Sequence, residues 1–399
     1  MSPGQQPSFK LIYLTAFTHL FGFGLLLPQL PQLVSGLGGA GFWYGLVVTV
    51  YAGGQFVGGP LLGRLSDRIG RKPVLLLSLG ASAAVLFATA YVDSLLALTL
   101  ARLAAGLAAG AILTCQAVIA DHTQPEKRAA TLGSLGASMG LGFVVGPALG
   151  AVLSDFGFSG ACFTAAIALG LNLLMVQFGF AERAPLHSSP SSAVPPGLGQ
   201  LAQYLQRPIV GRVLVACFLS AIALTALRGS FPMYMQDRFL LGPRGLGMVF
   251  TWIGLFAVFS QGVLVRILVR RWDEQRVARL GIALLAVCLG LLPLVPSLGA
   301  ALAVVAGLAL GQGLFIPTLT AVLSRATSAH EQGIVLGLGQ SATALARSLG
   351  PVSVGILYDQ NMALPYYAAA VTAAVALLIM YGLGSQRERH HRAPEVGMG

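Results

Sequence analysis

The sequence predicts an all-α membrane protein in which twelve transmembrane helices form two related bundles of six. Three observations predict this fold: the abundance of apolar residues, the recurrence of long apolar runs, and an internal repeat. Hydrophobic residues make up 56% of the 399 residues and charged residues only 9%, whereas a soluble protein has about 45–50% apolar and about 25% charged residues. No water-soluble fold buries so large an apolar surface.

Each predicted span is a continuous apolar run of about 20 residues, the length that crosses a hydrocarbon layer of about 30 Å. Continuous runs favour helices, because the strands of a membrane barrel alternate apolar and polar residues. Only Asp93 and Ser94 separate the third span from the fourth. The predicted spans are residues 11–34, 43–62, 74–92, 95–119, 130–153, 160–180, 210–235, 245–268, 278–296, 299–323, 333–357 and 365–383.

The net charge of +11 has a topological explanation. Apart from three arginines inside the spans, nearly all basic residues lie at the termini, on the connections after even-numbered spans or beside them. Only Arg238 and Arg244 fall on the opposite face. This asymmetry follows the positive-inside rule, so we expect a multi-pass protein of the cell (inner) membrane with both termini cytoplasmic. The basic residues form no single stripe, which argues against a nucleic-acid partner.

The cysteines and the N-terminus add little. All four cysteines, Cys115, Cys162, Cys217 and Cys288, fall inside predicted spans without metal-like pairing, so we interpret them as small apolar fillers and expect no metal or cofactor. The first span is longer than the apolar region of a signal peptide, which indicates a retained helix. We expect the chain to act as a monomer.

A polar linker and a repeat define the domain organisation. Residues 181–208 contain the run HSSPSSAVPPG, whose composition is typical of a flexible linker. We therefore predict an N-terminal bundle at 1–180 and a C-terminal bundle with its tail at 209–399. The sequence AGLAAG at 105–110 returns as AGLALG at 306–311, and a Gly-Pro pair at 146–147 returns at 350–351. Six spans are an even number, so both copies share one membrane orientation.

The connection between the second and third spans carries the most specific motif. It reads G-R-L-S-D-R-I-G-R-K and contributes Gly63, Asp67, Arg68, Gly70, Arg71 and Lys72. This run resembles the loop motif G-x-x-x-D-R-x-G-R-R/K of the major facilitator superfamily. We interpret it as a conformational latch in which Asp67 accepts bonds from Arg71 and from a helix N-terminus of the other bundle. Gly63 and Gly70 would allow close approach and a tight turn, and the alternative is that the charges only fix topology.

Two further motifs resemble the same family. Arg102 and Gly106 in the fourth span look like its second motif, and the fifth span reads G-F-V-V-G-P-A-L-G with Gly142, Gly146, Pro147 and Gly150. The latter is similar to the pattern of proton-coupled drug exporters, although Gly150 is followed by alanine where the pattern often has a second glycine. Small residues at four-residue spacing let helices pack closely, and Pro147 removes one helical hydrogen bond.

The likeness to the tetracycline-export branch runs over essentially the whole chain, for example in GFGLLLPQLPQL at 22–33 and GPVSVGILY at 350–358. The resemblance implies a small-molecule substrate, hydrophobic or amphipathic, that is exported by alternating access against an inward proton flow. It also implies intramembrane aspartates. Here His19 occupies the position of the first-span aspartate, and no predicted span contains Asp or Glu away from its ends.

The remaining ionisable groups within the spans are therefore candidates for function, because a charge near the bilayer centre costs about 2.5–3.5 kcal/mol. Arg228 and Arg347 are candidates for binding an anionic amphipath, and bonding to helix carbonyls or water is the alternative. For Arg102 a structural or conformational role is favoured. His19 is the candidate for proton coupling because its usual pKa of about 6.5 lies near working pH, although a neutral histidine bonding to another helix is equally compatible.

Uncharged polar side chains complete the candidate substrate site. Gln55, Gln116 and Gln340 offer contacts to a substrate, although such groups often only bond across helices. Two other functions compete with export. A facilitator or symporter of an anionic metabolite remains open, whereas an embedded enzyme is disfavoured because no span holds a nucleophile with a base or a metal cluster.

Overall fold

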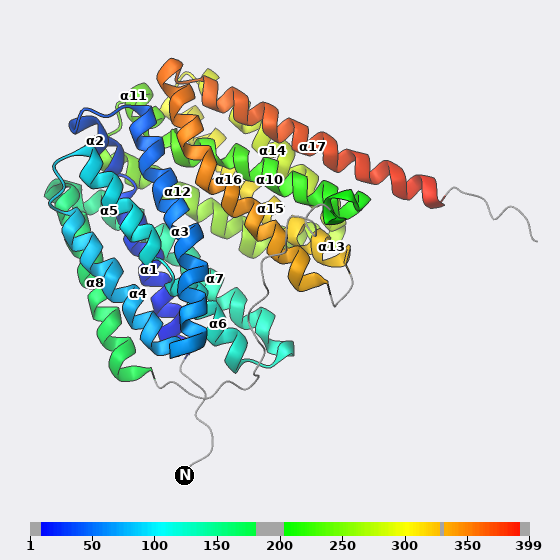
Figure 1. Ribbon diagram of the computed structural model, residues 1–399. Coiled ribbons are helices and arrows are strands. Elements are labelled where there is room, and N and C mark those ends of the chain that lie inside the picture. The colour runs from blue at the N-terminus through cyan, green and yellow to red at the C-terminus, as the bar shows by residue number, and fades with distance from the viewer. Residues whose placement is uncertain (1–8, 181–202, 328–330, 392–399) are drawn as a thin grey trace, which may run out of the picture. The chain divides into compact units, whose positions relative to one another are not determined.

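The computed structural model describes residues 9–180, 203–327 and 331–391. These residues are mostly helical and contain no strand, so the all-α prediction is confirmed (Figure 1). By length and composition they contain ten candidate membrane spans. The predicted fifth and sixth spans fall in one apolar segment, Ala130–Gly179, and the predicted eleventh span is not among the ten. It lies within the helix Gln332–Gln360, whose glutamine, serine, threonine and arginine residues lower its hydropathy.

In the first half of the chain, the described residues 9–180 form eight α-helices. They are α1 (Phe9–Leu26), α2 (Leu30–Gly36), α3 (Gly41–Ile69), α4 (Arg71–Thr89), α5 (Leu95–Ala108), α6 (Ala111–His122), α7 (Pro125–Val152) and α8 (Gly157–Gly179).

The fourth predicted span is interrupted, which the sequence did not indicate. It divides into α5 and α6 at Ala109 and Gly110, and a Cβ atom at Gly110 would collide with the side chain of Leu62. The Ser78 hydroxyl of α4 donates a hydrogen bond to the Ala108 carbonyl, a backbone group next to the break. A helix break within a membrane span is tolerated where a neighbouring helix satisfies the freed backbone groups in this way.

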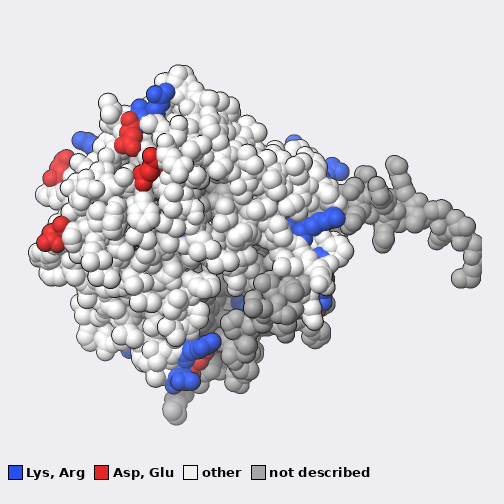
Figure 2. Space-filling model, turned by 45° about the horizontal axis from the view of Figure 1, so that its top comes forward, with Lys and Arg blue, Asp and Glu red and all other residues white. Residues whose placement is uncertain are grey.

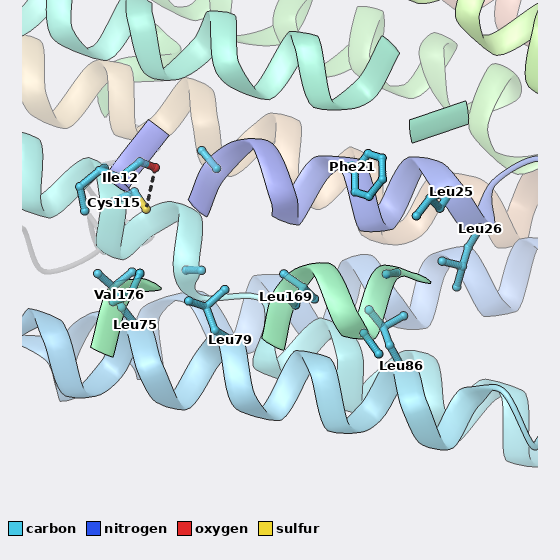
Figure 3. Packing of buried hydrophobic residues seen from close by; sticks show 14 of the residues in the cluster. Ile12, Phe21, Leu25, Leu26, Leu75, Leu79, Leu86, Cys115, Leu169 and Val176 are labelled. Carbon is cyan, nitrogen blue, oxygen red and sulfur yellow. Dashed lines mark hydrogen bonds between the residues drawn. The ribbon is translucent and has the colours of Figure 1, made fainter. Parts of the chain in front are cut away.

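The core of the first half lies between α1, α4, α6 and α8. Figure 3 shows Ile12 and Leu25 of α1, Leu79 of α4 and Leu169 of α8 in this cluster, all at most 2% exposed. One polar network crosses the same interface, because the Asn172 amide donates to the hydroxyl groups of Thr15 and Thr18 at 3.1 and 2.8 Å. Asn172 of α8 therefore bonds across to α1.

The second half forms α10 (Pro208–Gly229), α11 (Phe231–Phe239), α12 (Pro243–Phe259), α13 (Val265–Arg271), α14 (Glu274–Leu291), α15 (Leu298–Arg325), α16 (Gln332–Gln360) and α17 (Leu364–His391). The predicted seventh span breaks at Ser230, before Pro232, which lies in the first turn of α11. The eighth contains a π turn at Ser260–Leu264, where the Ser260 hydroxyl donates to the Leu310 carbonyl at 2.8 Å.

Both halves begin one helix in the same way, in keeping with the repeat. Ser94 caps α5 by accepting a hydrogen bond from the Ala97 amide, and Ser297 caps α15 by accepting one from the Ala300 amide. A serine at this position satisfies one of the unpaired N–H groups that begin every helix. The cap at Ser94 also confirms the predicted boundary between the third and fourth spans.

Contacts divide the chain into two compact units. The first comprises the described part of Met1–Ser192 with Leu227–Leu255 and Arg347–Met362, and the second comprises the described remainder. Parts of α10, α11, α12 and α16 thus cluster with the first six spans, while the predicted domain boundary at 181–208 stays a prediction. Most of that linker, residues 181–202, lies outside the described residues.

The second unit is organised around α14, which packs against α15 and α17. Gly281 of α14 and Gly311 of α15 face each other, and a Cβ atom on either would lie 2.8 Å from the other's carbonyl oxygen. In the same unit Arg207 forms two hydrogen bonds of 2.8 Å with Glu331, and these bonds raise the pKa of the Arg207 guanidinium. That pair ties the end of the linker to the start of α16.

Candidate transport site and gate contacts

Two predicted substrate-binding arginines lie near each other in the first unit. Arg228 ends α10 and Arg347 lies within α16, and their guanidinium groups are close enough to repel each other electrostatically. Both side chains are exposed. Neither forms a hydrogen bond or ion pair with any residue that the structure describes. Two adjacent, unneutralised cations are suited to binding an anion.

A tight helix contact lies directly beside this arginine pair. Pro351 follows Arg347 by one turn on α16, and a Cβ atom at Gly229, the residue after Arg228, would lie 2.8 Å from the Pro351 Cα. On the other side of α16, a Cβ atom at Gly45 of α3 would overlap the Pro351 carbonyl. Only glycine permits these approaches, so the pair is located at the edge of a closed contact between α3 and α16.

We name this contact the α3–α16 seam, formed by Gly41, Gly45 and Thr49 of α3 with Pro351, Val352, Gly355 and Asp359 of α16. The Thr49 hydroxyl accepts a hydrogen bond of 3.0 Å from the Val352 amide. Pro351 has no N–H group and so removes one helical hydrogen bond from α16 next to this contact.

The carboxylate of Asp359 joins α16 to α3 at the end of the seam. Asp359 accepts hydrogen bonds from the amides of Gly41 and Phe42 at 2.7 and 2.8 Å, and so caps a helix whose own N-cap residue, Ala40, provides no side-chain bond. The adjacent Tyr358 donates to the Asp237 carboxylate of α11 at 2.7 Å. Residues from opposite halves of the sequence are thus joined by hydrogen bonds that a movement of α3 away from α16 would break.

A second seam joins α7 to α12. A Cβ atom at Gly247 would lie 2.5 Å from the Pro147 carbonyl, and one at Gly254 would lie 2.7 Å from the Val144 side chain. Both glycines of α12 therefore meet the stretch of α7 that contains the predicted Gly-Pro motif.

On the face shown in Figure 2 charged side chains are few and stand in small groups, as expected for a surface that faces lipid.

The loop motif forms a different set of bonds from the one predicted. Arg71 pairs with Asp67 at 2.6 Å, as expected, but its second acidic partner is Asp121 of α6 at 2.8 Å. Gly70 has a φ of +101° and makes the tight turn, whereas a Cβ atom at Gly63 would meet no described atom within 4 Å. Lys72 donates to the Gln177 carbonyl at 2.7 Å, and Arg68 is exposed.

The predicted small-residue motifs are helix contacts. A Cβ atom at Gly106 would overlap the Tyr51 carbonyl of α3, which brings α5 against α3. On α7, a Cβ atom at Gly142, Gly146 or Gly150 would lie 2.5 to 2.7 Å from a carbonyl oxygen of α1. Pro147 stays inside an uninterrupted α7. The side chain of Arg102 is 5% exposed and belongs to the packed interior.

The other candidates lie apart from a common cluster. His19 is 8% exposed, and its Nε2 atom has no hydrogen-bond partner among the described residues. The Gln55 amide donates to the Tyr51 hydroxyl on its own helix at 3.3 Å, whereas Gln116 and Gln340 are exposed. Of the predicted substrate-binding residues, the structure thus brings Arg228 and Arg347 together within the first unit.

Sequence reasoning missed Asp121 and Asp359. Asp121 closes the run VIAD at the end of the fourth predicted span, and Asp359 ends the run GPVSVGILYD. Each is an acid at the end of a span, which was the only available signal. Their partners, Arg71 and the start of α3, are 50 and about 318 residues away in the sequence, and no local pattern reports such a pairing.

Comparisons with known proteins agree with this architecture. The family model of the Major Facilitator Superfamily matches residues 12–351 and, in an overlapping match, 213–397. The chain is 28% identical to a class B tetracycline resistance protein of Escherichia coli, over 89% of each chain. It is 26% identical to multidrug resistance protein 2 of Bacillus subtilis (strain 168), over 94% of each.

Among solved structures, the human organic anion transporter MFSD10 (TETRAN) matches with a TM-score of 0.69 and 23% identity, over 93% of this chain and 98% of that one. At this identity the likeness shows the fold alone. The family match spans most of the sequence, and the matched relatives are transport proteins rather than enzymes. This chain therefore belongs to the major facilitator superfamily of membrane transporters.

Proposed function

We propose that this transporter exports a small amphipathic organic anion by alternating access and that export is coupled to protons. The observation that carries the proposal is the pair formed by Arg228 and Arg347, two exposed and mutually repelling cations without a partner in the described part of the chain. A substrate carboxylate or similar group between them would supply the missing negative charge.

The composition of the spans supports an anionic substrate. A charged side chain near the bilayer centre costs about 2.5–3.5 kcal/mol, so such residues usually face a partner or a water-filled cavity. No predicted span contains an Asp or Glu away from its ends that could neutralise the pair. Related proteins named for tetracycline and multidrug resistance support an amphipathic substrate, and the name of the human organic anion transporter agrees with the charge.

The seams support alternating access. Helices that meet at glycines have no interlocked side chains there, so they can separate and pack again with little rearrangement. The hydrogen bonds from the Gly41 and Phe42 amides to Asp359 hold the two helices together while the seam is closed. The charge distribution of the connections supports cytoplasmic termini and a place in the cell's inner membrane. The α3–α16 seam would then lie on the extracytoplasmic side, and opening it would release a bound anion outward.

Ligand screening tests the substrate class. Purified protein is heated with matched anionic, neutral and cationic amphipaths, and the anionic compounds are expected to raise its melting temperature by mass action. Transport of the stabilising compound is then measured in proteoliposomes made with wild type, Arg228→Gln and Arg347→Gln. Both variants are expected to lose at least tenfold in transport, and Arg244→Gln, which removes an exposed arginine outside the pair, serves as the control.

Normal transport by correctly folded Arg228→Gln and Arg347→Gln proteins would overturn the role of the pair. Selective stabilisation by cationic compounds would overturn the anionic substrate class itself. The two results are separable because the first concerns residues and the second concerns ligands.

Proton coupling is assigned to His19 in this proposal. His19 is buried on α1, and its Nε2 atom, which has no partner in the described residues, is available to a proton or a substrate. We expect His19→Gln proteoliposomes to lose accumulation driven by a pH gradient while keeping exchange at equal pH. Full gradient-driven accumulation by this variant would exclude His19 as the carrier.

One observation favours a second candidate function. The spans lack the carboxylates that usually carry protons, so the chain also fits a facilitator or symporter of an anionic metabolite. Transport that does not depend on the pH gradient indicates a facilitator, and transport that an inward proton gradient drives inward indicates a symporter. Outward transport driven by inward proton flow supports the exporter.

A further inference from the structure

The third arginine of the spans lies in a buried cluster with more hydrogen-bond donors than acceptors. Arg102 of α5 is 5% exposed, and neither its Nε nor its Nη2 atom has a hydrogen-bond partner among the residues that the structure describes. A buried guanidinium stays charged, and burying an uncompensated charge costs several kcal/mol. Such a group therefore requires a partner that the described residues do not provide.

Two tyrosines of α3 border this guanidinium. Tyr44 and Tyr51 both interact electrostatically with Arg102, as does the Cys162 thiol of α8. The close contact between Gly106 and the Tyr51 carbonyl holds α3 against α5 one turn away. Tyr44 is 0% exposed and its hydroxyl has no partner within the described ranges. The Tyr51 hydroxyl accepts a hydrogen bond from Gln55, which leaves its own proton available to donate.

Hydrogen-bond donors outnumber acceptors in this cluster, although the tyrosine oxygens and the Cys162 sulfur can also accept a bond. Arginine has five N–H donors and no acceptor, and each tyrosine hydroxyl has one proton to give. An aspartate or glutamate would complete the cluster, but the acids of this chain lie outside the spans or at their ends. A water molecule would accept some of these bonds, but it would leave the positive charge uncompensated.

We propose that a monovalent inorganic anion of halide size binds between Arg102, Tyr44 and Tyr51. Its size follows from the helix contacts, because Gly54, Gly58 and Gly106 bring α3 and α5 close together and leave little room for an organic group. The site lies in the N-terminal half, whereas Arg228 and Arg347 belong to the C-terminal half of the sequence. The proposal is therefore independent of the transported substrate.

Bromide is the probe for this site. The purified full-length chain is heated in sodium bromide or sodium gluconate at equal ionic strength, and bromide is expected to raise the melting temperature by several degrees in a saturable manner. Tyr44→Phe is expected to raise the half-saturating bromide concentration about tenfold, the change for one lost hydrogen bond to a charged group. Arg102→Gln is expected to abolish the shift, and Arg244→Gln is expected to preserve it.

A direct measurement complements the titration. Crystals grown in bromide are expected to show an anomalous scattering peak between Arg102 and Tyr44. Equal melting temperatures in bromide and gluconate for wild type, or a bromide titration that Tyr44→Phe leaves unchanged, would overturn the proposal. Should Arg102→Gln fail to fold, Tyr44→Phe and Tyr51→Phe remain decisive, because each removes only a hydroxyl group.

Discussion

Arg71 shows how a single residue of the loop motif acts. Its guanidinium binds Asp67, four residues earlier, and Asp121, at the end of α6. It also donates to the Ser66 hydroxyl at 2.5 Å. Its side chain is 13% exposed, so these bonds are only partly screened by solvent. The motif therefore joins α3, α4 and α6 at one end of the first unit, in addition to any role in orienting the chain.

Replacing Asp121 tests this junction. Asp121→Asn keeps the shape of the side chain but removes the charge that Arg71 binds, so the free energy of unfolding is expected to fall by about 1.5–3 kcal/mol. Asp93→Asn, which changes an exposed acid of the next connection, serves as the matched control. Denaturant unfolding in a mild detergent measures both variants, and equal stability of the two would contradict the junction.

Among the individual residues, the sequence predicted those whose role depends on neighbours along the chain. The pairing of Asp67 with Arg71 spans one helical turn, and the turn at Gly70 is a local backbone property. Asp121 was not predicted, because its partner lies 50 residues away. The same limit applies to Tyr44 and Arg102, whose proximity depends on the packing of α3 against α5.

At the scale of elements, α3 carries contacts on two faces. Gly54 and Gly58 meet α5, while Gly41 and Gly45 meet α16. The first contact lies within the N-terminal half, and the second joins residues from opposite halves of the sequence. A helix with both kinds of contact can move together with the N-terminal half, keeping its contact with α5 and losing its contact with α16. This is the behaviour expected of a gate helix.

Adding one methyl group to this gate helix tests the seam. A Cβ atom in Gly45→Ala would overlap the Pro351 carbonyl, and we expect this variant to lose about 1–3 kcal/mol of stability through overpacking. Gly53→Ala changes the same helix where no described atom lies within 4 Å of the new Cβ, so it is expected to be neutral or up to about 1 kcal/mol more stable. Thermal unfolding of both proteins gives the comparison, and equal melting temperatures would argue against a closed seam.

A separate prediction concerns Asp359, which caps α3 at the end of the seam. Asp359→Ala removes both bonds to the start of α3, at an expected cost of about 0.5–2 kcal/mol for the lost cap. A cysteine introduced as Thr49→Cys is then expected to react faster with a membrane-impermeant thiol reagent. Asp93→Ala in the same background is the control, and an unchanged labelling rate in Asp359→Ala would show that the cap does not hold the seam.

For the whole molecule, the distribution of charge predicts one orientation in the membrane. The basic residues of the even-numbered connections and of both ends predict cytoplasmic termini. We expect a reporter that is active only in the cytoplasm to work when fused after Gly399, and a cysteine placed at Ser94 to react with an impermeant reagent from outside. Labelling of that cysteine only after the membrane is permeabilised would reverse the topology.

The membrane class, the helical fold, the approximate spans and the family could all be predicted from the sequence alone. These properties depend on composition, on the length of apolar runs and on short motifs, which are all local. Glycines at four-residue spacing also predicted close helix packing, which the contacts of Gly142 and Gly146 with α1 confirm. The breaks at Gly110 and Ser230 were not predicted. Beside the first, a hydroxyl group distant in the sequence, that of Ser78, bonds to the Ala108 carbonyl.

The packing of the helices was needed to learn which of the polar residues meet. It placed Arg228 beside Arg347 at the edge of the α3–α16 seam, joined Asp359 to the start of α3, and left the donors of Arg102 and Tyr44 without an acceptor in the described residues. Such contacts depend on the relative rotation and depth of helices far apart in the sequence. Apolar side chains face both the lipid and the protein core. The apolar pattern therefore predicts where the spans lie in the sequence but not which face of each helix packs against a neighbouring helix.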